Sequence, residues 1–244
     1  MKINLAISIL ILFSACKGDR SDDCLTSLGK EVSIIRSVEG YHKLYVEDRI
    51  QAVLVQDSSR YGEIEISGPE NLLEQVTSIV EEGRLNLKNN NTCNFVRSFD
   101  YELKVKIFVK SISEIYIESI ATVLSEGPIV IDKLEIYNYA LSDCSLELAG
   151  NEVFVQSRNS AFTELQGDIK VLKGSIEEIS EIDAGNLKCE DVLLDSHSPL
   201  DCMINASNGI FVNIYNSGNI IYNSEPSEYK LIGVRTGAGN LLKK

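Results

Sequence analysis

The chain has 244 residues, of which 44% are hydrophobic and 24% are charged, and its formal net charge is −13. This apolar content is enough for a folded core, which excludes an intrinsically disordered chain. The acidic balance argues against nucleic acid as a partner, because the sequence has no basic stripe to displace the counterions of phosphates. It argues equally against a polybasic attachment to anionic lipid.

The start of the chain has the pattern of an exported lipoprotein. Lys2 is the only charge before an apolar run at residues 3–13, which is too short to span a bilayer as a mature helix. Two small residues then lead into Cys16 and a charged stretch. This order resembles the lipobox of bacterial lipoproteins, with Phe13 in place of the usual leucine. We therefore expect residues 1–15 to be a signal peptide and Cys16 to carry acyl chains that attach the protein to a membrane. The alternative is a plain signal peptide followed by an incidental cysteine.

The next part of the chain predicts a tether followed by β-structure. Residues 16–31 lack hydrophobic periodicity and are predicted to form the tether. Over residues 32–110, apolar and polar residues alternate with period two in several short runs, which predicts a β-rich N-terminal part. Its clearest strand covers residues 101–109. The one good helix candidate covers residues 69–76, which begin with a proline and place apolar side chains at helical spacing.

An internal repeat of about 19 residues occupies residues 111–224, where two sets of short apolar strands alternate. The first set begins at Ile115, Leu134, Val153, Val171, Val192 and Ile210, and the second at Val123, Cys144, Leu165, Ile182, Cys202 and Ile220. One such unit cannot bury its own apolar face, so the units are expected to stack at the strand spacing of about 4.8 Å. We predict a single all-β domain over residues 32–244: a parallel β-solenoid resembling a right-handed β-helix, with an N-terminal β-rich cap and a C-terminal strand within residues 225–244. A meander or sandwich also fits the strand spacing, but the alternation of two sets favours the solenoid.

Short motifs spread over residues 34–244 resemble the putative auto-transporter adhesin, head GIN domain family. The similar segments are residues 36–57, 63–98, 217–227 and 233–244. The resemblance implies a β-solenoid-like domain in exported, often lipidated proteins of Gram-negative bacteria. It therefore implies a lipid-anchored protein of the outer membrane, facing either the periplasm or the cell surface. It implies no established activity.

Motifs that carry chemistry are scarce. Neither His42 nor His197 lies in a metal-binding spacing, no two cysteines have CxxC spacing, and there is no nucleophile elbow or phosphate-binding loop. We therefore expect no cofactor and no catalysis. The expected function is that of an interaction or adhesion module, attached to the membrane by its lipid, whose partner is an unidentified protein or glycan.

One set of acidic residues suggests alternatives to this function. Each member directly precedes a strand of the second set, so its side chain would point outward, one solenoid turn from the next. The set consists of Asp143, Glu164, Glu181 and Asp201. Because stacked like charges destabilise a sheet, the column could hold a divalent cation such as Ca²⁺ or a cationic glycan or peptide. It could also belong to a polysaccharide lyase or hydrolase that uses outer-face carboxylates. The interpretation that we favour is an ordinary solvated face.

Four tyrosines allow a similar choice. Tyr137, Tyr139, Tyr215 and Tyr222 could stack on sugar rings along a solenoid wall. Aromatic residues in strands more often cover the edge of the core or pair with each other across strands, and we favour that interpretation.

The cysteines give a first testable prediction. Cys144 and Cys202 hold equivalent positions three turns apart, about 14 Å, which is beyond the ~7 Å limit for a disulfide, and Cys189 has no obvious inward partner one turn away. The family resemblance places a cysteine at the positions of Cys24 and Cys93, and we predict one disulfide between these two. Non-reducing peptide mapping should find this bridge, and the other three thiols should react only after denaturation. A bridge between Cys144 and Cys202 would contradict both the pairing and the predicted register.

Overall fold

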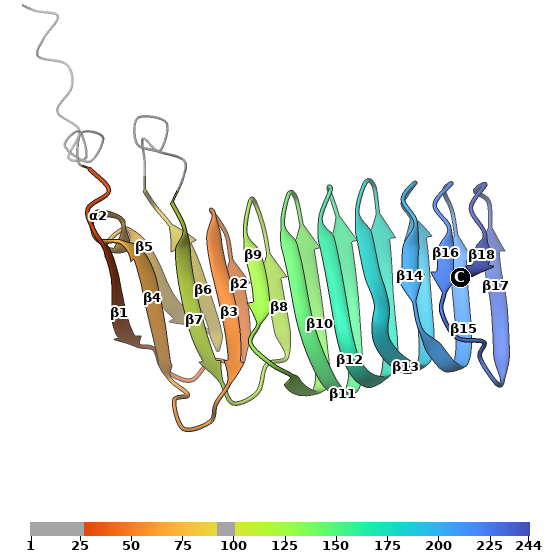
Figure 1. Cartoon of the computed structure of the whole chain (residues 1–244), viewed down its shortest axis with the longest axis horizontal. Helices are drawn as coiled ribbons and strands as arrows, with labels where there is room; N and C mark the ends of the chain where they lie inside the picture. The colour runs from red at the N-terminus through yellow and green to blue at the C-terminus, as the bar shows by residue number, and fades with distance from the viewer. Residues whose placement is uncertain (1–26, 92–100) are drawn as a thin grey trace, which may run out of the picture.

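Parallel strands stacked along one axis form the body of the molecule, and they run across that axis (Figure 1). The computed structural model describes residues 27–91 and 101–244. Within these residues, one sheet of 18 strands winds round the axis. The strands are β1 (Glu31–Ser37), β2 (Lys43–Val46), β3 (Ile50–Gln56), β4 (Glu63–Pro69), β5 (Val76–Glu81), β6 (Arg84–Asn89), β7 (Leu103–Val109), β8 (Glu114–Ile117), β9 (Thr122–Ser125), β10 (Ile129–Tyr139), β11 (Asp143–Arg158), β12 (Phe162–Glu177), β13 (Glu181–His197), β14 (Cys202–Ile204), β15 (Ala206–Ile214), β16 (Ile220–Tyr222), β17 (Tyr229–Arg235) and β18 (Leu241–Lys243).

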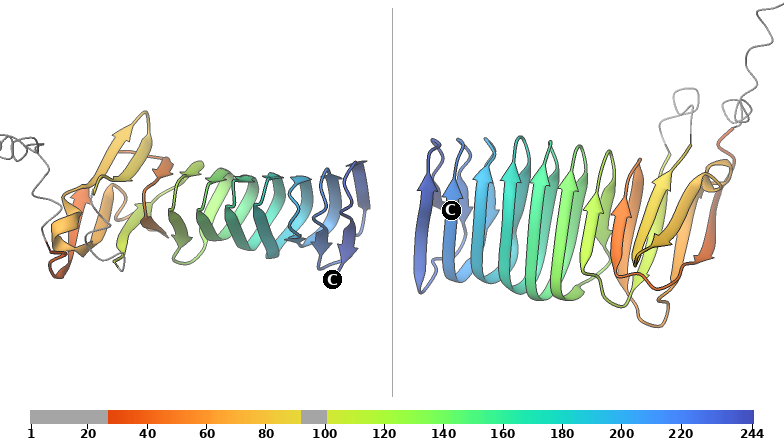
Figure 2. Two further views of the ribbon diagram at one scale, coloured as in Figure 1. Left: turned by 90° about the horizontal axis from the view of Figure 1, so that it is seen from above. Right: turned by 180° about the vertical axis from the view of Figure 1, so that it is seen from behind.

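Each turn of the solenoid has two walls, joined by a tight turn at one edge and a bend at the other (Figure 2). Strands β11, β12 and β13 continue through the bend without interruption. In β11 the bend contains Gly150 with φ 144°, where a Cβ would lie 1.9 Å from the Ile131 carbonyl oxygen, so only glycine fits. Successive turns pair in parallel, as Leu134 does with Val153. The predicted all-β parallel solenoid is therefore confirmed.

The first buried column follows the predicted repeat from Leu134 onward except at one turn. Val153, Val192 and Ile210 belong to it, but between them the column passes through Leu172 and not through Val171. Leu172 is fully buried, whereas Val171 faces outward and is half-buried. Because both residues are apolar and adjacent, the sequence pattern does not distinguish which of them faces the core.

The second buried column also differs from the prediction at one turn. Cys144 pairs with Thr163, and Thr163 pairs with Ile182, so Thr163 occupies the place predicted for Leu165. The buried Thr163 hydroxyl accepts a hydrogen bond of 2.9 Å from the side-chain amide of Asn138. A polar residue with such a partner can replace an apolar one in the core, and a search for apolar positions misses it.

The N-terminal part contributes full turns of the solenoid as well as a cap. β2 and β3 pair in parallel with β8 and β9 on one side, and with β6 and β7 on the other. The antiparallel pairs of the described residues each involve β1, β4 or β5, namely β1 with β4, β4 with β7 and β5 with β6, and they close this end. The solenoid thus extends beyond residues 111–224 in both directions, and residues 225–244 supply a last turn made of β17 and β18. At the first of the predicted turns, Ile115 pairs with Ile136 and not with Leu134.

The helix is shorter than the sequence pattern predicts. Helix α2 covers Glu70–Leu73, and its Leu72 and Leu73 side chains are buried. Val76 begins β5 instead of extending the helix, because β5 forms a hairpin with β6 that projects from the end of the stack (Figure 2). In the part of the chain that the structure describes, no helix has the length and apolar character needed to cross a membrane.

The last turn carries cations where earlier turns carry buried apolar residues. Beyond β17 and β18, no strand of residues 27–91 or 101–244 covers the C-terminal end. Lys230 and Arg235 pair with the fully buried Ile210 and Ile214, and Lys243 stands at a comparable position on the other wall. A further strand added at this edge would bury these charges, which is costly. Charged residues at such positions protect sheet edges from pairing with other chains.

This arrangement predicts the effect of removing the cations. The double substitution Lys230→Ile and Arg235→Ile restores the apolar residues of the preceding turn, so the open edge should pair with a second copy. Size-exclusion chromatography with light scattering should then show larger species that grow with protein concentration. The matched control is Lys170→Ile with Lys188→Ile, which removes two exposed charges away from the edge. Equal behaviour of the two double variants would show that general hydrophobicity, not edge protection, governs self-association.

Candidate functional site

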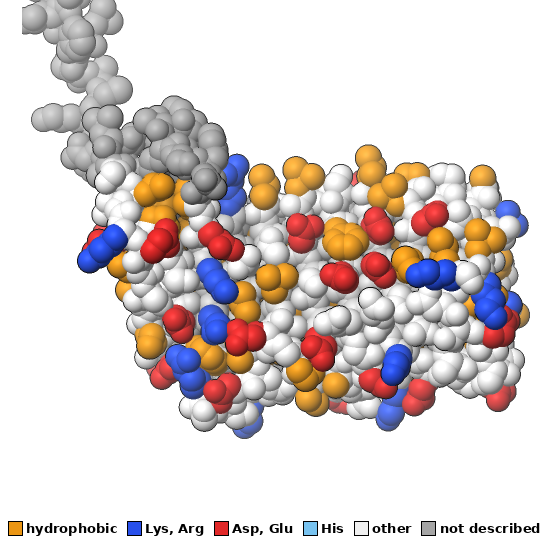
Figure 3. All heavy atoms as spheres, in the orientation of Figure 1, with side chains coloured by type: hydrophobic (Ala, Val, Ile, Leu, Met, Phe, Trp, Pro, Cys, Tyr) orange, Lys and Arg blue, Asp and Glu red, His pale blue; other side chains and the backbone are white. Residues whose placement is uncertain are grey.

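The predicted acidic residues lie on one wall of the solenoid but do not form a continuous column. Asp143 pairs with Phe162, and Phe162 pairs with Glu181, so an aromatic ring separates two of the carboxylates. Glu164 lies two residues further along its strand and pairs with Asp183. The predicted register placed Leu165 in the buried column that Thr163 occupies. Glu164 was therefore placed in the column of Phe162, two residues away from its actual position. Figure 3 shows acidic side chains gathered over the middle of the wall that faces the viewer, with hydrophobic side chains between them.

We call this region the acidic wall and define it by Asp143, Phe162, Glu164, Glu181, Asp183 and Asp201. Its carboxylates are partly satisfied by polar neighbours: Asp201 accepts hydrogen bonds from the backbone N–H and the side-chain amide of Asn219, at 2.7 and 2.9 Å. Within the described residues, Glu181 accepts no hydrogen bond from a side-chain amide; burial, then the charges of Asp183 and Asp201, raise its pKa above the usual range. No group of three or more His, Cys, Asp or Glu side chains within the described residues has the geometry to hold a metal ion.

A cluster of tyrosines occupies the opposite wall. Tyr45, Tyr116 and Tyr137 stand in register on β2, β8 and β10. The ring centroids of Tyr45 and Tyr116 are 5.3 Å apart and nearly parallel, and those of Tyr116 and Tyr137 are 5.9 Å apart. Tyr139 meets Tyr116 edge-on at 5.1 Å, and Phe154 lies 6.2 Å from Tyr137. We call these five residues the tyrosine wall.

The tyrosine hydroxyls donate to acceptors on neighbouring strands. The Tyr45 hydroxyl is 2.7 Å from Glu118 and 3.1 Å from Glu47. The Tyr137 hydroxyl donates to Glu135 at 2.9 Å, and burial together with this carboxylate raises the pKa of Tyr137 to about 12. Burial and the neighbouring carboxylates also raise the pKa of Tyr45. These hydroxyls are therefore neutral at physiological pH and act as donors.

Two of the four predicted surface tyrosines belong to this cluster. Tyr137 and Tyr139 lie in it, whereas Tyr215 lies nearer the C-terminal end and stacks on His197 with centroids 4.1 Å apart. Tyr222 is buried. The sequence analysis missed the contribution of β2 to the cluster because the repeat was not traced into the N-terminal part. The available signal was the shared pattern of β2 and β8, in which a charged residue and then a tyrosine alternate with buried apolar residues.

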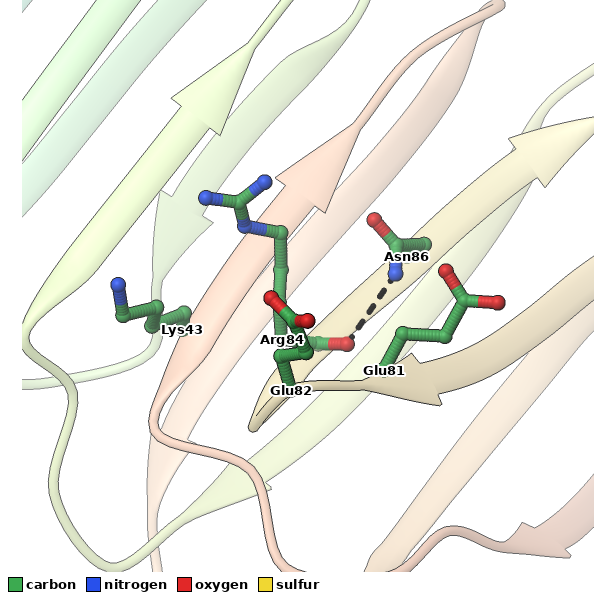
Figure 4. Close-up of a pocket in the computed structure, with 5 residues that line it drawn as sticks. All are labelled: Lys43, Glu81, Glu82, Arg84 and Asn86. Carbon is green, nitrogen blue, oxygen red and sulfur yellow. Dashed lines mark hydrogen bonds between the residues drawn. The ribbon is translucent and has the colours of Figure 1, made fainter.

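An open hollow lies at the N-terminal end of the tyrosine wall (Figure 4). It has a volume of about 650 Å³ and is lined by Lys43, Glu81, Glu82, Arg84 and Asn86. Lys43 and Arg84 both contact the carboxylate of Glu114, at 3.2 and 2.7 Å. In Figure 4 the Glu81 and Glu82 carboxylates point in different directions: Glu81 ends β5, whereas Glu82 lies in the hairpin turn with φ 50°. The hollow thus combines both charge signs without bringing two carboxylates together.

The three cysteines of the solenoid are free and buried, as predicted. They are Cys144, Cys189 and Cys202. Burial raises the pKa of each thiol, to about 12 for Cys189, so all three stay protonated and unreactive. Cys16, Cys24 and Cys93 lie outside the described residues.

The charge repulsion on the acidic wall gives a testable prediction. Glu181→Gln removes the repulsion from Asp183 and Asp201, so the free energy of unfolding should rise by about 0.5 kcal/mol at low ionic strength. Urea unfolding should show this gain, and 1 M NaCl should abolish it, because the screening length falls to about 3 Å. Glu147→Gln is the control, since Glu147 pairs with the uncharged Gln166. A loss of stability in Glu181→Gln contradicts the prediction, and selective stabilisation of the wild type by millimolar Ca²⁺ would instead identify a cation site.

Comparisons with known proteins agree with this architecture. A family model described as putative auto-transporter adhesin, head GIN domain, matches residues 40–226, and the search of curated proteins finds no match. A putative adhesin from Bacteroides fragilis has 19% sequence identity and a TM-score of 0.77, with 88% of this chain and 97% of that chain covered. A putative adhesin from Parabacteroides merdae has 17% identity and a TM-score of 0.60, with 89% and 98% covered. A putative lipid binding protein from Parabacteroides distasonis has 15% identity and a TM-score of 0.60, with 88% and 97% covered. These identities show a shared fold alone, but the family model spans most of the chain, so the protein belongs to the head GIN domain family that the sequence motifs predicted.

Proposed function

We propose that this protein is a non-catalytic interaction module of the bacterial cell envelope, which binds an extended protein or glycan through the walls of its solenoid. Membership in a family described as adhesin head domains supports this function. So do the solved relatives of the same fold, which are called putative adhesins. The partner class follows from the shape of the molecule, since a straight wall several turns long matches a polymer better than a small molecule.

One observation carries the proposal: the side chains capable of chemistry lie in columns on flat walls and do not converge on a cleft. On the acidic wall, Asp143 and Glu181 stand two turns apart with Phe162 between them. On the tyrosine wall, the hydroxyls already donate to carboxylates. Glycoside hydrolysis instead needs two carboxyl groups placed on either side of one bond, one of them protonated.

The alternative function is that of a polysaccharide lyase or hydrolase, and one pair of residues favours it. Glu181 has a raised pKa and lies beside Asp201, an arrangement that resembles an acid paired with an ionised carboxylate. The close carboxylate Asp183 and the open wall argue against it, since a catalytic acid works best in a site that excludes water.

The anchor is a separate part of the proposal. The apolar run at residues 3–13 and the small residues before Cys16 support lipid attachment there. An anchor at Cys16 would place the solenoid at the outer membrane of a Gram-negative cell, since the solved relatives come from Bacteroides and Parabacteroides species.

The test is to measure binding and cleavage in one experiment. The purified full chain, presented with panels of bacterial and host polysaccharides and of outer-membrane proteins, should retain at least one class without shortening it. Tyr139→Ala should weaken binding at least tenfold, because Tyr139 lies at one end of the tyrosine wall beside Arg158. Tyr229→Ala is the matched control, since Tyr229 belongs to the last turn, away from that wall.

Each other result has a defined meaning. New reducing ends or unsaturated sugars that disappear in Glu181→Gln would establish the enzyme in place of the binding module. The absence of both retention and cleavage would contradict the proposed function. Urea unfolding of each variant confirms that a loss of binding is not a loss of fold.

A further inference from the structure

The tight turns at one edge of the solenoid expose large apolar side chains at the same position of successive turns. Thr122, Asp143, Phe162 and Glu181 stand in register, so the residues two places before them are equivalent. Three of these are Ile120, Leu141 and Ile179, with 51%, 64% and 60% of their surface exposed. In the next turn the equivalent residue is Pro199, because Asp183 pairs with Met203, and the exposed Leu200 directly follows it. We call Ile120, Leu141, Ile179 and Leu200 the apolar crest. Figure 3 shows hydrophobic side chains along the upper edge.

The fold does not require these residues to be apolar. Ser160 occupies the equivalent position in the turn between Leu141 and Ile179. The chain turns at the same place there, because Ala140, Asn159 and Glu178, which precede the three positions, all have φ near 60°; Ser160 itself also has a positive φ, of 72°. The solenoid thus accommodates a polar residue at this position, and exposed Leu and Ile in the other turns indicate a role other than packing.

The crest is held in a straight line by buried hydroxyls beneath it. Ser180 donates to the Ser157 carbonyl oxygen at 2.7 Å, and Ser198 donates to the Ser180 carbonyl oxygen at 2.7 Å. Ser142 donates to Asn138 across its own tight turn, and the side-chain amide of Asn138 donates to the Phe162 carbonyl oxygen of the next turn at 2.8 Å. Each turn is thus tied to the next at about the 4.8 Å strand spacing, which sets the interval between crest positions.

The opposite edge has a different character. Its bends contain Asn151, Asp168, Lys188 and Glu228 among other polar residues. Of the exposed large apolar residues in the described part of the chain, Val130 lies at these bends. The apolar character is therefore specific to the crest.

The N-terminal tether leaves the fold at the same edge as the crest. The described chain begins at the edge formed by the tight turns (Figure 1), and the Ser27 carbonyl oxygen accepts a 2.8 Å hydrogen bond from Asn71. Cys16 precedes Ser27 by 11 residues. An extended segment of that length spans at most about 40 Å, so a lipid on Cys16 would bring a bilayer close to this edge.

We propose that the apolar crest rests on the membrane to which Cys16 anchors the chain, so that its side chains enter the boundary between headgroups and acyl chains. This inference rests on the lipid anchor of the proposed function. The crest is a single row of residues, too narrow for a stable protein interface of about 800 Å² per partner, but single apolar side chains can enter a lipid surface. The net charge of −13 and the acidic Glu118 and Glu178 next to the crest favour an uncharged, zwitterionic lipid surface over an anionic one.

The absence of tryptophan from the chain allows a direct test. Leu141→Trp places one fluorophore on the crest, and Val130→Trp places one at the opposite edge, at a residue of similar exposure. The lipidated full chain is reconstituted in phosphatidylethanolamine–phosphatidylcholine vesicles with brominated acyl chains. The Leu141→Trp variant should be quenched at least twofold and its emission should shift to shorter wavelength, whereas the Val130→Trp variant should keep the emission of exposed tryptophan.

The arms of the experiment separate the anchor from the crest. Co-sedimentation of the full chain with vesicles, lost in Cys16→Ser, establishes the anchor; failure to co-sediment overturns the anchor and this inference together. Co-sedimentation with equal, unquenched emission from both tryptophan variants overturns the inference alone. A blue shift of the Leu141→Trp variant without vesicles, increasing with protein concentration, would show that a second copy covers the crest, which also overturns it. Ile179→Trp repeats the measurement at a second crest position if Leu141→Trp fails to match the wild type in urea unfolding.

Discussion

In-register stacking of parallel strands is the constraint on which the rest of this structure depends. Because each turn lies about 4.8 Å above the last, every side chain meets the side chain at the same position of the next turn, and like residues stack on like. Inside, this favours the protein, since columns such as Leu134, Val153 and Leu172 form one continuous core. Outside, the same rule brings carboxylates together. The structure offsets this repulsion with uncharged side-chain amides one turn away, which donate hydrogen bonds to the carboxylates. These pairs are Asp191 with Asn208 at 2.9 Å, Asp195 with Asn213 at 2.6 Å and Asp201 with Asn219 at 2.9 Å.

Of these pairs, Asp201 with Asn219 lies on the acidic wall, at the turn where its carboxylates end toward the C-terminus. The strands β14 and β15 that follow β13 contain no charged residue, so they separate the acidic turn from the cationic last turn. Glu181 lacks an equivalent amide, and its burial, followed by the charges of Asp183 and Asp201, raises its pKa. The tyrosine wall solves the same problem differently, because Tyr45 and Tyr137 hydroxyls donate directly to carboxylates of their own wall. Both walls are therefore polar surfaces whose groups have partners within the protein, which suits binding more than reaction.

Sequence periodicity was sufficient to predict the solenoid, the length of its turns and the buried thiols. It was not sufficient for the register, because a repeat is traced from apolar residues and does not reveal hydrogen bonds. Thr163 enters the core through its contact with Asn138, so the predicted column was placed at Leu165 instead. That single shift moved Glu164 into the wrong column and made the acidic residues look continuous. The repeat also did not reveal that the turn made of β2 and β3 lies between the turn made of β6 and β7 and the turn made of β8 and β9. The order of these turns in space differs from their order along the chain. The tyrosine wall depends on that insertion, and so its β2 member could not be found from the repeat alone.

The two ends of the stack leave the walls and the crest as the surfaces available for interaction. At the N-terminal end, β1, β4 and β5 pair antiparallel and interrupt the parallel repeat, so another solenoid cannot continue it in register. At the C-terminal end, Lys230 and Arg235 would have to be buried before a strand could be added. A solenoid closed at both ends does not grow into a fibre, in contrast to open repeats whose faces match head to tail. Its contacts with other molecules must then be made by its sides. This geometry suits a rod whose crest edge lies along a surface and whose two walls face a partner.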